Sequence, residues 1–239
     1  MTAIVRLLRL GRSDYRTALN LQRELHASRK LGNCSDHLLL TEHEPVLTLG
    51  RGADERFVRA SASSLAELGI ELIGTERGGN VTYHGPGQLV IYPILDLRAY
   101  GRDVHRYIRC LEESVLRLLG RYGLAGRLLS GTPGVWVGER KIASVGVFVS
   151  QWTTMHGLAI NIAPDLRQFA LIHPCGLVDG QMTSIAAEIG LAPPMEEVSD
   201  RYASIFAEVF DADLREEDLP PAVEAASRIP TSQNRPHGA

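Results

Sequence analysis

The stretch from Glu76 to Pro93, ERGGNVTYHGPGQLVIYP, places four glycines within ten residues and then runs directly into an apolar strand pattern. Glycine loses much backbone entropy on folding, so this density indicates positive φ angles or a close approach of another group to the backbone. Within the stretch, Gly85-Pro86-Gly87-Gln88 fits a type II turn. Two interpretations are open: a surface loop with a tight turn or, because polar residues crowd around the glycines, a binding loop.

Apolar periodicity predicts helices and strands that follow one another without regular alternation. Helices are predicted at Asp14–Lys30, Ser61–Leu68, Asp103–Leu119, Ser184–Ile189 and Glu196–Phe210, and strands at Val5–Leu10, His37–Thr41, Pro45–Leu49, Leu89–Leu97, Gly134–Val137, Lys141–Val149 and Thr154–Ile162. Gly138-Glu139 is the predicted turn of a hairpin. Pro93 indicates an edge strand or an irregularity, because proline has no N–H to donate to a ladder. This mixture predicts an α+β domain built on a mixed sheet.

The chain has 239 residues, which fits one large domain, assigned here to residues 1–218. Residues 219–239 are rich in proline, alanine and serine and are predicted to form a disordered tail. The net charge of −3 gives no electrostatic reason for the whole molecule to bind nucleic acid. No apolar run approaches the roughly 18 residues that a membrane span needs. The N-terminus is interspersed with arginines and is unlike a signal peptide.

The three cysteines are Cys34, Cys110 and Cys175. An odd and widely spaced set is neither a disulfide framework nor a zinc site, and it favours a reducing, cytoplasmic location. Cys175 lies in His173-Pro174-Cys175-Gly176, where proline and glycine keep it out of a regular apolar run. It is therefore the best nucleophile candidate of the three, although a small buried hydrophobe is the commoner role of a free cysteine.

Lys141 begins a strand in which alternation places it on one face with Ala143 and Val145. A lysine at the end of such a face commonly extends to water. If its ammonium is held in a low-dielectric site instead, its pKa falls and it can act as a base. A lysine beside a cysteine also favours the thiolate. His84 and His156 are either partners of the cysteine or satisfied polar residues, and the histidines show no zinc spacing.

Together these segments resemble the lipoyl/octanoyl transferase family, whose members are octanoyl-acyl carrier protein:protein N-octanoyltransferases. The matching motifs are RGGNVTYHGPGQLVIYP (Arg77–Pro93), GVWVGERKIASVGV (Gly134–Val147), HGLAIN (His156–Asn161) and PCGL (Pro174–Leu177). They follow the family's order, and the N-terminal HEPVLTLGR also fits. Asn80 departs from the pattern, because it stands where an acidic residue is common.

The resemblance implies a mixed β-sheet flanked by helices, similar to the catalytic domains of biotin and lipoate protein ligases. It implies an acyltransferase with a Cys/Lys dyad, in which Cys175 carries the acyl group and Lys141 supports it. It implies no cofactor, neither ATP nor a metal. The substrate-binding residues that it implies are Arg77, Gly78, Gly79, Asn80, Val81, Thr82, Tyr83, His84, Ser144, Val145, Gly146, Gly157, Leu158 and Ala159.

The implied reaction is the first step of endogenous protein lipoylation. An octanoyl (or lipoyl) group moves from acyl carrier protein to Cys175 as a thioester. It then moves to a lysine of the lipoyl domains of 2-oxoacid dehydrogenase E2 subunits, or of the glycine cleavage H protein. These partners are acidic, and candidate contact patches are Arg102, Arg106 and Arg109, or Arg12 and Arg16; a solvated helix face is the alternative.

Three other functions stay open. An ATP-dependent lipoate or biotin-type ligase of the same fold would activate a free acid and needs no nucleophilic cysteine. A Cys–His hydrolase would use His84 or His156 and release the free acid. A non-catalytic acyl-binding module would keep its function after Cys175→Ser.

Overall fold

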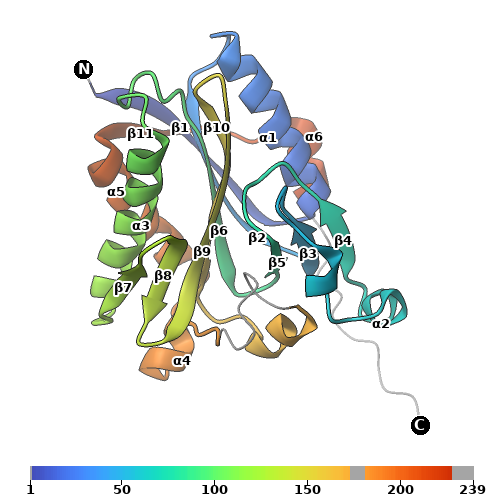
Figure 1. The fold of residues 1–239 in the computed structure, drawn as a ribbon. Coiled ribbons are helices and arrows are strands. Elements are labelled where there is room, and N and C mark those ends of the chain that lie inside the picture. Colours follow the sequence, from blue (N-terminus) through green and yellow to red (C-terminus); the bar gives the residue numbers. More distant parts are fainter. Residues whose placement is uncertain (1, 173–180, 228–239) are drawn as a thin grey trace.

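The computed structural model describes residues 2–172 and 181–227 of the chain. The predicted nucleophile Cys175 and the neighbouring His173 lie outside the described residues. An eight-stranded mixed sheet forms the centre of the molecule, with strand order β11-β1-β2-β6-β10-β9-β8-β7 (Figure 1). A three-stranded sheet, β4-β3-β5, lies beside helix α1.

The strands are β1 (Ala3–Ser13), β2 (Asp36–His43), β3 (Val46–Leu49), β4 (Glu71–Gly74), β5 (Val81–His84), β6 (Gln88–Ile94), β7 (Gly126–Leu129), β8 (Thr132–Val137), β9 (Arg140–Ser150), β10 (Thr153–Asn161) and β11 (Ala212–Glu216). The α-helices are α1 (Tyr15–Lys30), α2 (Ala62–Glu67), α3 (Val104–Gly120), α4 (Ile185–Ile189), α5 (Met195–Phe210) and α6 (Pro221–Ser227), and short 3₁₀ helices span Glu55–Phe57 and Leu166–Leu171. The order mixes helices and strands as the sequence predicted.

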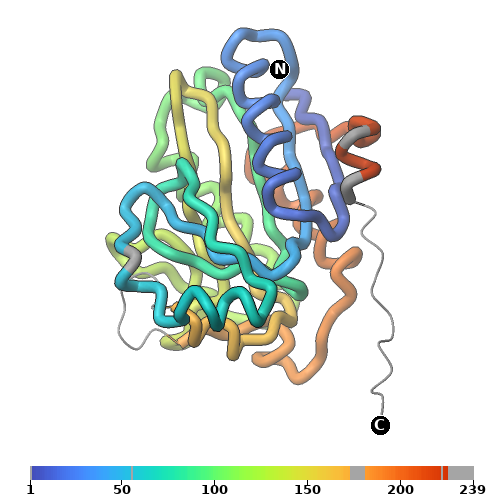
Figure 2. Tube along the Cα trace, turned by 90° about the vertical axis from the view of Figure 1, so that its right-hand side faces the viewer, coloured from blue at the N-terminus to red at the C-terminus, as the bar shows by residue number. Residues whose placement is uncertain are grey.

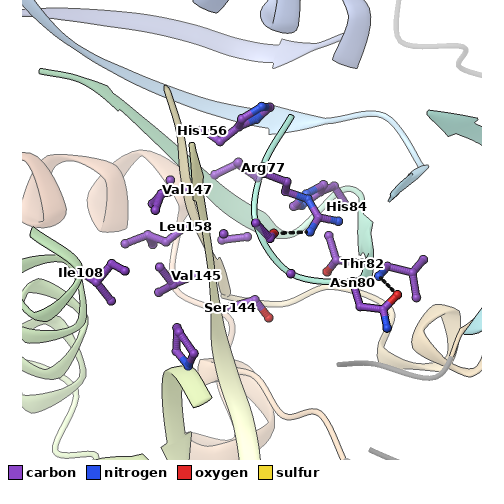
Figure 3. A pocket seen from close by; sticks show the side chains of 18 of the residues that line it. Arg77, Asn80, Thr82, His84, Ile108, Ser144, Val145, Val147, His156 and Leu158 are labelled. Carbon is purple, nitrogen blue, oxygen red and sulfur yellow. Dashed lines mark hydrogen bonds between the residues drawn. The ribbon is translucent and has the colours of Figure 1, made fainter. Parts of the chain in front are cut away.

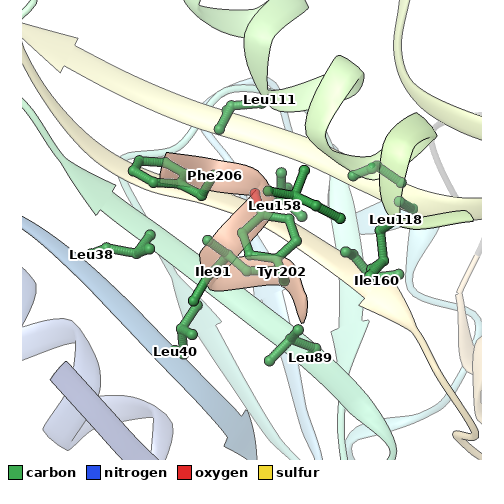
Figure 4. Packing of buried hydrophobic residues seen from close by; sticks show 14 of the residues in the cluster. Leu38, Leu40, Leu89, Ile91, Leu111, Leu118, Leu158, Ile160, Tyr202 and Phe206 are labelled. Carbon is green, nitrogen blue, oxygen red and sulfur yellow. The ribbon is translucent and has the colours of Figure 1, made fainter. Parts of the chain in front are cut away.

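Helices cover both faces of the large sheet, α3 and α5 on one and α1 and α6 on the other (Figures 1 and 2). Side chains alternate along each strand, so one strand serves two cores. Leu89 and Ile91 of β6 join the apolar core under α3 and α5 (Figure 4). Val90 and Tyr92 of the same strand belong to the smaller cluster that packs against α1.

Two aspartates fix where the long helices begin. Asp14 accepts a hydrogen bond from the Thr17 amide at 2.8 Å and caps α1. Asp103 accepts one from the Arg106 amide at 2.9 Å and caps α3. Such caps satisfy amides that have no partner within the helix, and each typically contributes about 1 kcal/mol. Both helices therefore begin within a residue of the predicted positions.

Pro93 does not lie in an edge strand, because β6 pairs with β2 on one side and with β10 on the other. The irregularity that proline also predicted is present: the β6–β10 ladder stops where Ile91 pairs with Leu158, and antiparallel pairing resumes beyond Pro93 at the Asp96–Thr153 bridge. Thr154 fills the interruption with its side chain, which donates to the Pro93 carbonyl at 2.7 Å and accepts from the Leu95 amide at 2.8 Å. The hydroxyl thus satisfies one backbone carbonyl and one backbone amide at the interruption.

Four short strands and one α-helix were not predicted. β4 and β5 belong to the three-stranded sheet. β7 and β11 form the two edges of the large sheet, and β11 pairs in parallel with β1. Disorder was predicted from Leu219, whereas Pro221–Ser227 form helix α6, which buries Val223 and packs on β1 and α1. Residues 228–239 lie outside the described residues, so the rest of the tail stays a prediction.

Candidate active site

The β8–β9 hairpin positions Lys141. Its turn is the predicted Gly138-Glu139, with Gly138 at φ 57°. A bulge interrupts the pairing, because Val135 lies opposite Ala143 while Trp136 lies opposite Lys141. The residue between, Ile142, has no opposite partner, and the alternation inverts there. Lys141 therefore shares a face with Trp136 and not with Ala143, which corrects the face predicted from simple alternation.

Lys141 is 5% exposed, and the hairpin holds its side chain closely. Its ammonium donates to the Pro133 carbonyl at 3.2 Å and lies 4.9 Å from the centre of the Trp136 ring. Gly134 lies directly beneath it at φ 137°, and a Cβ at this position would be 2.6 Å from Lys141 Cε. Glycine is therefore required here on two grounds, backbone conformation and space.

Glu112 of α3 holds this part of the hairpin from the other side. Its buried carboxylate accepts a hydrogen bond from the Gly134 amide at 2.9 Å. The same peptide unit, Pro133–Gly134, presents the carbonyl that receives the Lys141 ammonium. Glu112 thus fixes the orientation of the Pro133–Gly134 peptide, and the carbonyl of that peptide binds the Lys141 ammonium.

Lys141 also connects to the chain that follows the segment containing Cys175. The Lys141 amide donates to the Gln181 carbonyl at 2.9 Å, and the Thr183 amide donates to the Lys141 carbonyl at 2.9 Å. Residues 181–183 therefore run beside Lys141 as a short parallel bridge centred on Met182. Cys175 itself lies outside the described residues, so the Cys/Lys dyad stays a prediction.

The glycine-rich loop is fixed by Arg77. Arg77 is 7% exposed, and its guanidinium donates to the Thr48 carbonyl at 2.6 Å and to the Gly78 carbonyl at 3.1 Å. The Gly78 amide donates to Val147 of β9 at 2.8 Å, so the loop lies directly on that strand. Gly146 permits this approach, because a Cβ there would be 3.2 Å from the Gly78 carbonyl oxygen. Arg77 therefore shapes the loop by binding its backbone.

The type II turn predicted after the loop is present. Gly87, its third residue, has φ 87°, and the Gln88 amide donates to the Gly85 carbonyl at 3.2 Å. The turn returns the chain into β6 at Gln88, directly opposite Asn161 of β10.

The hairpin and the glycine-rich loop line a cavity of about 530 Å³. Apolar side chains from α3, β9 and β10 lie on one side of it and the polar glycine loop on the other (Figure 3). Lys141 lines it, together with the predicted residues Arg77, Gly78, Gly79, Asn80, Val81, Thr82, His84, Ser144, Val145, Gly146, Gly157, Leu158 and Ala159. Tyr83 does not line it, because β5 turns its ring to the opposite side, edge-on to Phe169 at 5.5 Å.

Sequence reasoning did not find several lining residues. Tyr15 and Tyr92 come from segments that otherwise form an ordinary amphipathic helix and a buried strand. Ile108 is one apolar residue in the stripe of α3. None of these positions carries a local signal, because only packing brings them to the cavity.

His84 and His156 both lie at the polar side of the cavity. Burial lowers the pKa of His84 to about 3 and also lowers the pKa of His156. His156 Nε2 lies 3.4 Å from Glu76 Oε2. The His156 ring, together with Arg23, lowers the pKa of Glu76 to about 2. At neutral pH the site therefore contains neutral imidazoles and an ionised Glu76.

Among residues 2–172 and 181–227, no three histidine, cysteine or acidic side chains are placed to bind a metal ion together. Within the same residues, every helix is too short or too polar to cross a membrane.

Residues 14–207 match the family model of the lipoyl protein ligase A/B catalytic domain. An octanoyltransferase of Solibacter usitatus is 49% identical over 208 residues, covering 87% of this chain and 94% of that protein. An octanoyltransferase of Chloroflexus aggregans is 48% identical, covering 84% of this chain and 93% of that protein.

Solved structures of lower identity share the fold. A putative lipoate protein ligase of T. acidophilum with bound lipoic acid superposes with a TM-score of 0.70 at 19% identity, covering 94% of this chain and 93% of that one. Lipoate-protein ligase A bound with ATP gives a TM-score of 0.68 at 18% identity, covering 95% and 93%. The predicted mixed sheet with flanking helices, similar to lipoate ligase catalytic domains, is confirmed.

Proposed function

The chain belongs to the lipoyl protein ligase A/B catalytic domain family, and we propose that it transfers an octanoyl group from acyl carrier protein to a lysine of lipoyl domains. Relatives named octanoyltransferase support an acyltransferase of protein lipoylation. The observation that carries the finer proposal is the cavity, which gathers Lys141 with the loop Arg77–His84 and the strand segments Ser144–Gly146 and Gly157–Ala159.

In the proposed first step, the Cys175 thiolate attacks the carbonyl carbon of the octanoyl thioester. A carbon–sulfur bond to Cys175 forms and the bond to the carrier sulfur breaks. The Lys141 ammonium gives a proton to the departing carrier thiolate and becomes a neutral amine. One thioester replaces another, so the step is nearly isoenergetic and requires no ATP.

In the second step, the neutral amine of the acceptor lysine attacks the thioester on Cys175. Lys141 takes the proton that the new amide nitrogen loses, and Cys175 departs as a thiolate. The starting ammonium and thiolate are restored. Conversion of a thioester to an amide drives this step.

The apolar side of the cavity suits the alkyl chain. The wall on this side is aliphatic and consists of Ile108, Val145, Val147 and Leu158 (Figure 3). Burial of each methylene contributes about 0.8 kcal/mol, so an octanoyl chain gains several kcal/mol from this wall. The cavity is within the size range of small-molecule sites.

The exposed arginines of α3 are the better candidate surface for the acidic protein substrates. Arg12 and Arg16 are already paired with Glu44 at 2.7 Å and Glu71 at 2.9 Å. Arg102 and Arg106 are exposed at the start of α3, two turns or less from the cavity residue Ile108. Charge reversal at both positions is expected to raise KM for the carrier, most strongly at low salt.

Intact-protein mass spectrometry tests the proposal. The enzyme is mixed with octanoyl-acyl carrier protein, without ATP and without acceptor. We expect one octanoyl adduct that maps to Cys175 and is absent from Cys175→Ser. The adduct should persist in the control variant Cys110→Ser, because Cys110 is partly buried and does not line the cavity. Octanoylation that appears only when octanoate and ATP are supplied would instead support the ligase reaction. Release of free octanoate without acceptor would assign the hydrolase.

A further inference from the structure

His84 begins a chain of buried side-chain hydrogen bonds that ends beside Lys141. His84 Nδ1 lies 3.1 Å from Gln88 Oε1, and Gln88 Nε2 lies 3.1 Å from Asn161 Oδ1. Asn161 Nδ2 lies 2.9 Å from the Thr183 carbonyl oxygen. Thr183 in turn donates its amide to the Lys141 carbonyl. All four side chains of this group are at least nine-tenths buried, so none of these bonds is shared with bulk water.

Two backbone carbonyls fix the direction of every bond in the chain. The Thr183 carbonyl can only accept, so the Asn161 amide nitrogen must face it and Asn161 Oδ1 must face Gln88. The Tyr83 carbonyl, 3.2 Å from Gln88 Nε2, can likewise only accept. Both constraints leave Gln88 Oε1 facing His84 as an acceptor. The proton of a neutral His84 must therefore lie on Nδ1.

The opposite ring nitrogen, Nε2, then carries a lone pair. It has no hydrogen-bond partner among residues 2–172 and 181–227, and the ring lines the cavity. The groups that face the ring are Tyr15 of α1, stacked at 6.0 Å, His43 of β2, Arg77 of the loop and His156 of β10. None is an acid that would stabilise an imidazolium.

We propose that Gln88 and Asn161 are positioning residues that hold His84 as the Nδ1–H tautomer, so that the cavity presents a hydrogen-bond acceptor at Nε2. This inference rests on the proposed function, which it sharpens by naming the substrate chemistry that the cavity prefers. A lone pair binds a neutral N–H donor, such as the amine or amide nitrogen of the acyl acceptor, and repels a carboxylate. The site thereby disfavours the free acid that a ligase reaction would start from.

Long-range ¹H–¹⁵N NMR of the wild-type enzyme tests the tautomer directly, with His84→Gln used to assign the resonance. We expect a protonated Nδ1 and an unprotonated Nε2 between pH 6 and 8. An Nε2–H tautomer, or an imidazolium at pH 6, would overturn the proposal. This measurement requires no acyl transfer and no variant other than the one used for assignment.

Gln88→Met tests the role of the positioning residue. Methionine has a similar length, but it cannot accept the hydrogen bond from Nδ1 of His84. The proton of the neutral ring is then free to move to Nε2, which becomes a donor. We expect the preference for N-methyloctanamide over octanoate, measured by calorimetry, to shift about tenfold toward octanoate. Gln151→Met makes the same change on the exposed β9–β10 turn and is expected to leave the preference unchanged. A shift of equal size in both variants, or in neither, would contradict the assignment.

The outcomes separate this inference from the proposed function. An octanoyl adduct on Cys175 together with an Nε2–H tautomer would support the proposed transferase function and contradict the positioning role of Gln88 and Asn161. The Nδ1–H tautomer without any adduct would keep the hydrogen-bond chain and remove the transferase.

Discussion

The two faces of the central sheet are built from the same strands, and both carry an apolar core, but the face under α1 also buries a group of hydrogen-bonded polar side chains. On the face under α3 and α5, strands β2, β6 and β10 present aliphatic side chains such as Leu40, Ile91 and Ile160 (Figure 4). On the opposite face the same strands present His43, Gln88 and Asn161, all buried and hydrogen-bonded. The period of two along each strand makes this division possible.

The comparison shows that the two kinds of contact contribute differently to stability and to chemistry. Packing on the apolar face is non-directional and stabilises the fold in proportion to the area buried. The polar face relies on directional bonds, which fix the orientation of each group and cost much when one partner is lost. Changes on the first face are therefore expected to alter stability, and changes near the cavity to alter the reaction.

The largest effect is expected at Lys141. Lys141→Met keeps the length and apolar stem of the side chain but removes the proton carrier, so kcat for octanoyl transfer should fall by about 10²–10⁴. Arg140→Met, one residue away on an exposed part of β9, is the matched control and should retain wild-type kcat. Equal kcat for both variants would remove Lys141 from the mechanism. Steady-state kinetics with a lipoyl domain provides the measurement.

Leu111→Ala tests the apolar face. Leu111 is fully buried on the inner face of α3, and truncation there should lower the free energy of unfolding by about 2–5 kcal/mol. Activity per folded molecule should change little, because Leu111 does not line the cavity. Urea denaturation and active-site titration of the same sample separate the two quantities. A large loss of activity in fully folded enzyme would show that the two faces are coupled.

Gly134→Ala is expected to affect both quantities. The added Cβ overlaps Lys141 Cε and the Ala143 carbonyl, so Lys141 must move and kcat should fall by more than about tenfold. Gly123→Ala is the matched control, because Gly123 also has positive φ but has open space around it. It should lose only about 1 kcal/mol of stability from backbone strain and retain its activity. Similar kcat values in the two variants would contradict the role of Gly134.

The smallest effect concerns pH. Burial lowers the pKa of His43 to about 4 in the folded protein, below its ordinary value of 6.5. Between these values the unfolded chain binds the proton and the folded protein does not, so stability falls as pH decreases from 6.5 toward 4. His43→Asn should reduce the loss of stability between pH 7 and pH 5 by about 1–2 kcal/mol. An undiminished loss in urea titrations at the two pH values would show that His43 is not the group responsible.

Local features of the fold were predictable because neighbouring residues determine them. The caps Asp14 and Asp103 and the turn glycines Gly87 and Gly138 carry their signals within a few positions. Four strands were missed because each is short and acquires strand geometry only by pairing with a neighbour; they are β4, β5, β7 and β11.

The site was predictable in its composition and not in its geometry. The motifs named most of the residues that line the cavity, but the Tyr83 ring packs against Phe169 outside it. The bulge at Ile142 inverted the face of Lys141, and nothing in the local sequence indicates a bulge there. The links from Glu112 to Gly134 and from His84 to Thr183 join residues 22 and 99 positions apart, so only the folded chain reveals them.

The most direct test of the account is the fate of the acyl group on Cys175. Octanoyl-enzyme is formed, separated from the carrier protein and mixed rapidly with a lipoyl domain. Samples quenched at successive times are then measured by intact-protein mass spectrometry. We predict that the adduct disappears as the octanoyl-domain appears, at a rate no slower than steady-state turnover, and that Lys141→Met slows this discharge. An adduct that survives many turnovers would show that the transferred octanoyl group does not pass through Cys175.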